Sequence, residues 1–116
     1  MQIYEVSQIN EIIKAGFDNS PLFRNLCIRG EIFNIKYHSS GHIYFSLKDS
    51  SSTIKCVMFR SYTYKLRFRP DNGQVVLACG YISAYPRDGI YQLYCSDMSK
   101  GGEGDLQLKL EDLKKS

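Results

Sequence analysis

The sequence predicts a mainly β domain in which five short strands form a small barrel, preceded by a helix and followed by a helical tail. Between residues 24 and 98, apolar and polar residues alternate in several short runs, as in strands with one buried face. Glycine, proline, aspartate and serine cluster between these runs, where the chain must turn. The length of 116 residues fits one domain, because single cores usually run to about 100–150 residues.

The first element is a helix over about residues 1–18. Ser7 is the expected N-cap, and Gly16 is expected to end the helix. Apolar residues recur at helical spacing at Val6, Ile9, Ile12 and Ile13. A similar pattern in the tail, at Leu106, Leu110 and Leu113, predicts the start of a second helix over 103–116.

The barrel is expected over residues 24–98, and its first strand covers about 24–37. In this strand Leu26, Ile28, Gly30 and Ile32 lie on one face, with Arg29 and Glu31 on the other. We expect Gly30 to mark a bend or bulge, because glycine relieves crowding where a sheet coils.

Two further strands follow the turn YHSSGH. In the first, Ile43, Phe45 and Leu47 are expected to face inward. In the next, Ile54, Cys56 and Met58 are expected inside, with Lys55, Val57 and Phe59 outside.

The polar run 60–73 is expected to be a short helix or an irregular connection, with Phe68 in the core. Two more strands flank the turn PRDG at 86–89, and the second is expected to direct Tyr91 and Leu93 inward. Five short strands with a helical link after the third predict a Greek-key barrel of the OB type. A plain five-stranded sandwich is the alternative that periodicity leaves open.

The four cysteines, at 27, 56, 79 and 95, contain no C-x-x-C pair and lie in strand-like surroundings. We expect buried, reduced thiols, and no zinc site. No run approaches the roughly 20 apolar residues of a membrane span, and the N-terminus lacks a signal-peptide pattern. We therefore expect a cytoplasmic protein that has no membrane partner.

The basic residues are concentrated in the middle of the chain. The formal net charge is +3, but residues 24–69 hold nine basic residues against Glu31 and Asp49, a balance of +7. The segments before and after are each −2. Such a stretch, interleaved with aromatic residues, is typical of nucleic-acid binding.

Binding of a single strand needs aromatic planes for the bases and cations for the phosphates. Tyr44 and Phe59 would supply the planes, beside the loop 37–42. The predicted nucleic-acid-binding residues are Arg29, Lys36, His38, Ser40, Gly41, His42, Tyr44, Lys48, Lys55, Phe59, Arg60 and Arg87. Arg87 is expected at the same rim of the barrel as the loop 37–42.

His38 and His42 are the only histidines, and no carboxylate lies nearby in the sequence to complete a metal triad. No residue pattern indicates a nucleophile with an oriented base, and no phosphate-binding glycine motif occurs. We expect no catalytic residue, metal or cofactor in this chain.

These residues resemble the N-terminal domain of the large subunit of bacterial exodeoxyribonuclease VII. The similar segments cover nearly the whole chain in the family's order, with Phe33 as a departure where the family usually has a small serine. They are VSQINEIIK (6–14), IRGEIFN (28–34), SSGHIYFSLKD (39–49), CVMF (56–59), YQL (91–93) and GEGDLQLKLEDLKK (102–115).

The resemblance implies an OB domain that binds single-stranded DNA. In that family the enzyme degrades single-stranded DNA from both ends to oligonucleotides without a divalent metal, and several small subunits join each large one. The resemblance further implies that the nuclease site lies in an absent catalytic domain, so the fragment alone would be inactive. Its partners would be single-stranded DNA, the rest of the large subunit and the small subunits.

The alternative to DNA binding is a protein-docking module with little DNA affinity of its own. Tyr81, Tyr85 and Tyr94 provide polar aromatic surface of the kind favoured at protein interfaces.

Overall fold

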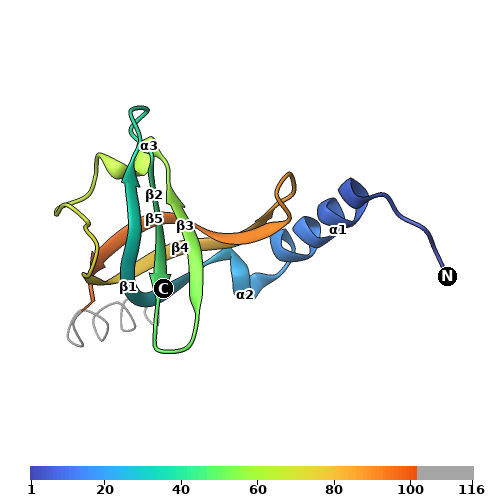
Figure 1. Ribbon diagram of the computed structural model, residues 1–116, viewed down its shortest axis with the longest axis horizontal. Coiled ribbons are helices and arrows are strands. Elements are labelled where there is room, and N and C mark those ends of the chain that lie inside the picture. Colours follow the sequence, from blue (N-terminus) through green and yellow to red (C-terminus); the bar gives the residue numbers. More distant parts are fainter. Residues whose placement is uncertain (102–116) are drawn as a thin grey trace.

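The computed structural model describes residues 1–101, and the predicted helix over 103–116 lies outside the described residues. Figure 1 shows a barrel with a helix projecting from one side. The helices are α1 (Val6–Asp18), α2 (Pro21–Arg24) and α3 (Arg60–Thr63), and the strands are β1 (Leu26–Tyr37), β2 (Ile43–Lys48), β3 (Thr53–Met58), β4 (Val75–Tyr85) and β5 (Ile90–Lys100).

The five strands close into a barrel in the order β1-β2-β3-β5-β4. Every neighbouring pair is antiparallel except β3 and β5, which are parallel. Only two register pairs join β3 to β5, Cys56 with Leu93 and Val57 with Tyr94. The predicted five-stranded barrel is confirmed, and the plain five-stranded sandwich is excluded.

The core follows the predicted alternation along β2 and β3. Ile43, Phe45 and Leu47 are buried on β2, and Cys56 and Met58 are buried on β3. The other strands contribute buried Ile32, Val76, Ala78, Leu93 and Met98, and Phe68 packs partly buried against this cluster. Each fully buried aliphatic side chain stabilises the fold by about 1.5–3 kcal/mol.

Val57 faces outward, as predicted, yet it is only 2% exposed. Its register partners are Tyr44 on β2 and Tyr94 on β5. Residues paired in register point to the same face of a sheet, so these two large rings flank the small valine and cover it.

The bulge in β1 lies further along the strand than predicted. The register of β1 against β2 shifts between Phe33 and Lys36, and Asn34 has a φ of 53°. Asparagine adopts this left-handed conformation more readily than most residues. Gly30 instead lies in regular pairing with Val76, so there is no bulge at this glycine, although a Cβ there would lie only 3.1 Å from Leu47 Cβ.

Helix α1 differs from the prediction at both ends. Glu5 is the N-cap, and it forms a capping box with Gln8. The helix continues through Gly16 to Asp18 and is capped by Asn19. Ser7 is therefore inside the helix, and Gly16 does not end it.

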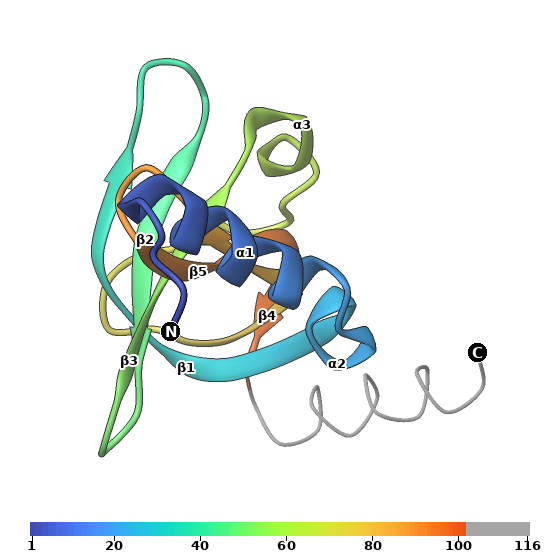
Figure 2. The same ribbon diagram turned by 90° about the vertical axis from the view of Figure 1, so that its right-hand side faces the viewer.

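Helix α1 lies along the β4–β5 hairpin (Figures 1 and 2). Asn10 Nδ2 donates a hydrogen bond to Pro86 O at 2.8 Å, and Ser83 Oγ donates to Asp18 Oδ1 at 2.5 Å. Lys14 pairs with the other oxygen of Asp18, and these two partners lower the pKa of that carboxyl, Lys14 more than Ser83. Tyr91 is 55% exposed and stacks on Phe17, so its predicted inward orientation was wrong.

Two of the four cysteines depart from the prediction of free thiols. Cys27 and Cys79 form a disulfide, because they are direct register partners on β1 and β4. Cys56 and Cys95 are free and buried, as predicted. Burial raises the pKa of Cys95 to about 12, and it raises the pKa of Cys56 further.

Candidate nucleic-acid interface

The β1–β2 loop over residues 38–42 is a tight hairpin. His38 N donates to His42 O at 2.9 Å, and Gly41 N donates to His38 O at the same distance. The backbone N–H of Ser40 donates to His38 Nδ1 at 3.1 Å. Because Nδ1 accepts this bond, the neutral His38 ring carries its proton on Nε2.

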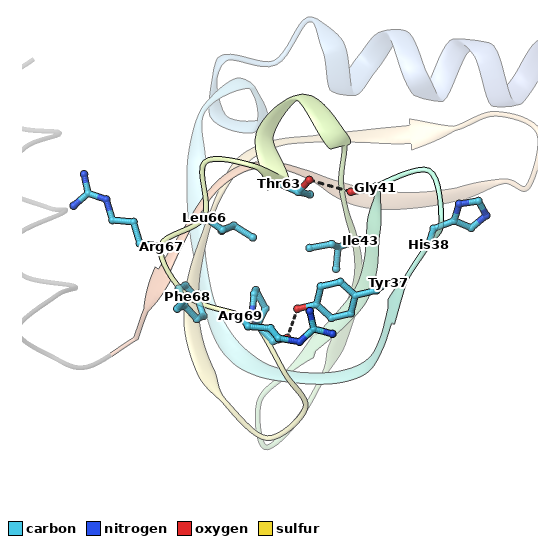
Figure 3. Close-up of a pocket in the computed structure, with 10 residues that line it drawn as sticks. Tyr37, His38, Gly41, Ile43, Thr63, Leu66, Arg67, Phe68 and Arg69 are labelled. Carbon is cyan, nitrogen blue, oxygen red and sulfur yellow. Dashed lines mark hydrogen bonds between the residues drawn. The ribbon is translucent and has the colours of Figure 1, made fainter.

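Two hydrogen bonds join this loop to α3. The backbone N–H of Arg60 donates to His42 Nδ1 at 2.8 Å, and Thr63 Oγ1 donates to Gly41 O at 2.9 Å (Figure 3). His42 therefore also carries its proton on Nε2, as a donor suited to an anion. The structure brings together four of the predicted residues here, Gly41, His42, Phe59 and Arg60.

Aromatic rings continue from this loop across the outer face of the barrel. His42 lies 5.2 Å from Phe59, Phe59 lies 6.0 Å from Tyr94, and Tyr94 stacks on Tyr81 at 4.9 Å, all between ring centroids. We call His42, Tyr44, Phe59, Tyr81 and Tyr94 the aromatic band. Its members come from the β1–β2 loop, β2, the β3–α3 junction, β5 and β4.

The aromatic band is open to solvent over much of its length. Tyr44, Phe59 and Tyr81 are 43%, 38% and 45% exposed. Exposed patches of large rings on protein surfaces are often interaction sites. Partial burial, followed by the neighbouring Tyr94, raises the pKa of Tyr81, so its hydroxyl remains a donor at neutral pH.

Two of the predicted lysines lie beside Tyr44. Lys36 is its register partner on β1, and Lys55 pairs with Ser46, two residues along β2. Both lysines are exposed. They add positive charge at the edge of the aromatic band.

Arg29 and Lys48 lie in a different place. They line a separate groove of about 510 Å³ that also contains Glu31 and Asp49. Lys48 Nζ lies 3.7 Å from a carboxylate oxygen of Glu31 and 5.4 Å from the ring centroid of Phe33. Its charge is thus partly engaged within the protein.

Arg87 lies in the β4–β5 turn, between Tyr85 and Gly89. This turn is held against α1 by Asn10, and Figures 1 and 2 show it apart from the β1–β2 loop. The structure therefore does not bring Arg87 to the rim formed by residues 38–42.

Sequence reasoning missed the open hollow at the mouth of the barrel. It has a volume of about 430 Å³ between the β1–β2 loop and residues 63–70. The guanidinium of Arg69 lies 4.1 Å from the ring centroid of Tyr37, whose hydroxyl donates to Pro70 O. Figure 3 shows Arg67 directed away from the hollow. The basic run RFRP was the available indication, but its position over the barrel depends on the closed fold.

Within residues 1–101, no three histidine, cysteine, aspartate or glutamate side chains are grouped to hold a metal ion. None of the described helices is long and apolar enough to cross a membrane.

Gly41→Ala is expected to lower the free energy of unfolding by about 1–3 kcal/mol. Gly41 has a φ of +96°, and a Cβ there would lie 2.8 Å from Arg60 Cγ. Urea denaturation followed by circular dichroism measures the change. Gly73→Ala is the matched control, because its φ is +88° with nothing within 4 Å of the added carbon. An equal loss in both variants would mean that the contact with Arg60 is unimportant.

The class of protein is clear from its match to a known family. Residues 4–99 match the family model described as an OB-fold nucleic acid binding domain. The chain therefore belongs to this family, and the predicted fold is confirmed.

The relatives are more specific. The chain is 52% identical over 109 residues to the exodeoxyribonuclease 7 large subunit of Clostridium botulinum (strain Hall), covering 94% of this chain and 27% of that protein. It is 51% identical over 115 residues to the same subunit of Clostridium novyi, covering 99% of this chain and 29% of that protein. The predicted resemblance is confirmed, and the chain spans less than a third of these relatives.

Solved structures share the fold at low sequence identity. The Schizosaccharomyces pombe Stn1–Ten1 complex gives a TM-score of 0.57 at 18% identity, over 77% of this chain and 66% of that one. A replication protein A heterotrimer bound to single-stranded DNA gives 0.56 at 13% identity, over 78% and 66%.

Proposed function

We propose that this domain binds single-stranded DNA for a nuclease of the exodeoxyribonuclease VII type. The observation that carries the proposal is the partly exposed aromatic band, which runs from the β1–β2 loop and β2 past the end of β3 to β5 and β4. Base stacking on such rings contributes about 1–3 kcal/mol per base and tolerates any sequence. The replication protein A structure, which has a similar fold and is bound to single-stranded DNA, supports this choice of ligand.

The basic side chains beside the aromatic band also suit single-stranded DNA. Lys36, Lys55 and Arg60 flank the band, and the backbone bonds of the β1–β2 loop hold His42 with a donor on Nε2. Together they offer positive charge and hydrogen-bond donors to a phosphate backbone that runs beside the rings. The other predicted residues, His38, Ser40, Gly41, Arg29, Lys48 and Arg87, would act by shaping the loop or by making more distant phosphate contacts.

The relatives are subunits of an exodeoxyribonuclease, so the domain would present the strand to a nuclease. That enzyme would degrade single-stranded DNA from both ends to oligonucleotides, without a divalent metal. Its active site would lie outside these residues, so the isolated domain would be inactive. The remainder of the large subunit and the small subunits would be its partners, in the cytoplasm.

Titration of a fluorescent oligo-dT at two salt concentrations tests DNA binding. We expect saturable binding that weakens as salt rises, because bound cations release counterions from the phosphates. Tyr44→Ala should weaken binding about five- to a hundredfold through lost stacking, and Lys36→Ala should reduce the salt slope by about 1. Tyr64→Ala, at an exposed ring outside the band, is the control. Absence of saturable binding at low salt would contradict the proposal.

Docking to another protein is the second candidate, and α1 favours it. Three apolar residues of α1 are exposed: Val6, Ile12 and Ile13. The apolar face of an amphipathic helix normally packs against another surface. If the rest of the enzyme covers this face, adding it to the domain should change the chemical shifts of α1 residues. Perturbation by oligo-dT of the aromatic band alone would assign the two faces to separate partners.

A further inference from the structure

The aromatic band crosses the line where the barrel closes. Its first members lie on β2 and at the end of β3, where DNA binding was predicted from the sequence. Tyr94 and Tyr81 extend it over β5 and β4, with ring planes only 12° apart. The surface available for stacking therefore extends beyond the face of β2 and β3, over β5 and β4.

A hollow of about 380 Å³ lies beyond Tyr81, between that strand and the two N-terminal helices. It is lined by Phe17, Asp18, Phe23, Arg24, Tyr81 and Ile82. Its volume is in the range of small-ligand sites.

The chemistry of this hollow is aromatic and cationic. Phe23 packs edge-on against Phe17 at 5.1 Å, next to the exposed ring of Tyr81. The carboxylate of Asp18 accepts hydrogen bonds from Lys14 and Ser83, and the positive charge of Lys14 compensates its negative charge. Within residues 1–101, Arg24 makes no ion pair, so its guanidinium is available to an external anion.

We propose that this hollow binds one nucleotide of a single strand that follows the aromatic band. The base lies against the ring of Tyr81, and its phosphate is bound by Arg24, whose planar guanidinium suits two phosphate oxygens. The inference rests on the proposed function, because the same strand occupies both regions. It places one end of the bound strand at the α1–α2 junction.

A strand that reaches this hollow must span more of the surface than one held at β2 and β3 alone. The two regions can therefore be separated by ligand length. An oligo-dT of about 4 nucleotides and one of about 12 lie near the two ends of the range of site sizes for such barrels.

The test compares both oligonucleotides on the wild-type domain and on its variants. Tyr81→Ala should weaken binding of the longer oligonucleotide about five- to a hundredfold, and binding of the shorter one less than about twofold. Arg24→Ala should reduce the salt slope by about 1 for the longer ligand only. Tyr44→Ala should weaken both. Tyr81→Phe, which keeps the ring, should bind like the wild type.

Tyr64→Ala is the control, because Tyr64 is an exposed ring that lies outside both the band and the hollow. Arg24→Ala removes an exposed side chain and keeps the test valid if Tyr81→Ala fails to fold. If Tyr44→Ala weakens binding but Arg24→Ala and Tyr81→Ala match Tyr64→Ala, the inference is overturned and the proposed function stands. If neither oligonucleotide binds the wild type, the proposed function itself fails.

Discussion

Gly80→Ala is expected to prevent folding, or to lower the free energy of unfolding by more than about 4 kcal/mol. A Cβ at Gly80 would lie 2.0 Å from Tyr94 O and 2.9 Å from Tyr94 C. Both atoms belong to the backbone of the neighbouring strand, which cannot rotate away as a side chain can. The register of β4 against β5 also shifts between Cys79 and Gly80, so the close approach is part of a bulge.

Urea and thermal denaturation followed by circular dichroism would measure the effect of Gly80→Ala. Gly16→Ala is its control, because nothing lies within 4 Å of a Cβ at that helical position. Alanine there should stabilise α1 by about 0.5–1 kcal/mol. A loss below about 1 kcal/mol for Gly80→Ala would show that the two strands do not approach so closely.

Removal of the Cys27–Cys79 disulfide has the second largest expected effect. The bond joins residues 52 apart in sequence, and closing a loop of this length stabilises the folded state by up to about 4 kcal/mol relative to the unfolded chain. The double variant Cys27→Ser and Cys79→Ser should therefore unfold at markedly lower urea concentration. Wild-type protein treated with a reductant should behave in the same way.

Thiol titration provides an independent check on the disulfide. In urea without reductant, only Cys56 and Cys95 should react with a thiol reagent. In the folded protein both should react slowly, because burial raises their pKa values and keeps them protonated. Four reactive thiols in urea would contradict the disulfide.

The sequence was sufficient to predict the strands and the inward faces of β2 and β3. Alternation depends on the two-residue period of a strand, so Phe45 and Leu47 could be placed without knowing their neighbours. The disulfide could not be found in this way, because Cys27 and Cys79 become neighbours only through the pairing of β1 with β4. The burial of Val57 likewise depends on rings from β2 and β5.

The same distinction applies to the candidate site. Four of the predicted residues lie together: Gly41, His42, Phe59 and Arg60. The β1–β2 loop and the end of β3 are brought side by side by the pairing of β2 with β3. Tyr81 and Tyr94 lie beside them only because β5 pairs in parallel with β3, although β4 separates these two strands in the sequence. Arg87 was placed by analogy between two loops, and the packing of its hairpin against α1 leaves it apart.

The short β3–β5 pairing has a consequence for motion. Two register pairs hold this edge, whereas six join β2 to β3. Backbone amides along the edge therefore have fewer partners to protect them from exchange with solvent, and local opening of the sheet begins there. Phe59 and Tyr94 lie on opposite sides of this edge. A ligand stacked on both rings would therefore hold β3 and β5 together and slow the exchange of these amides.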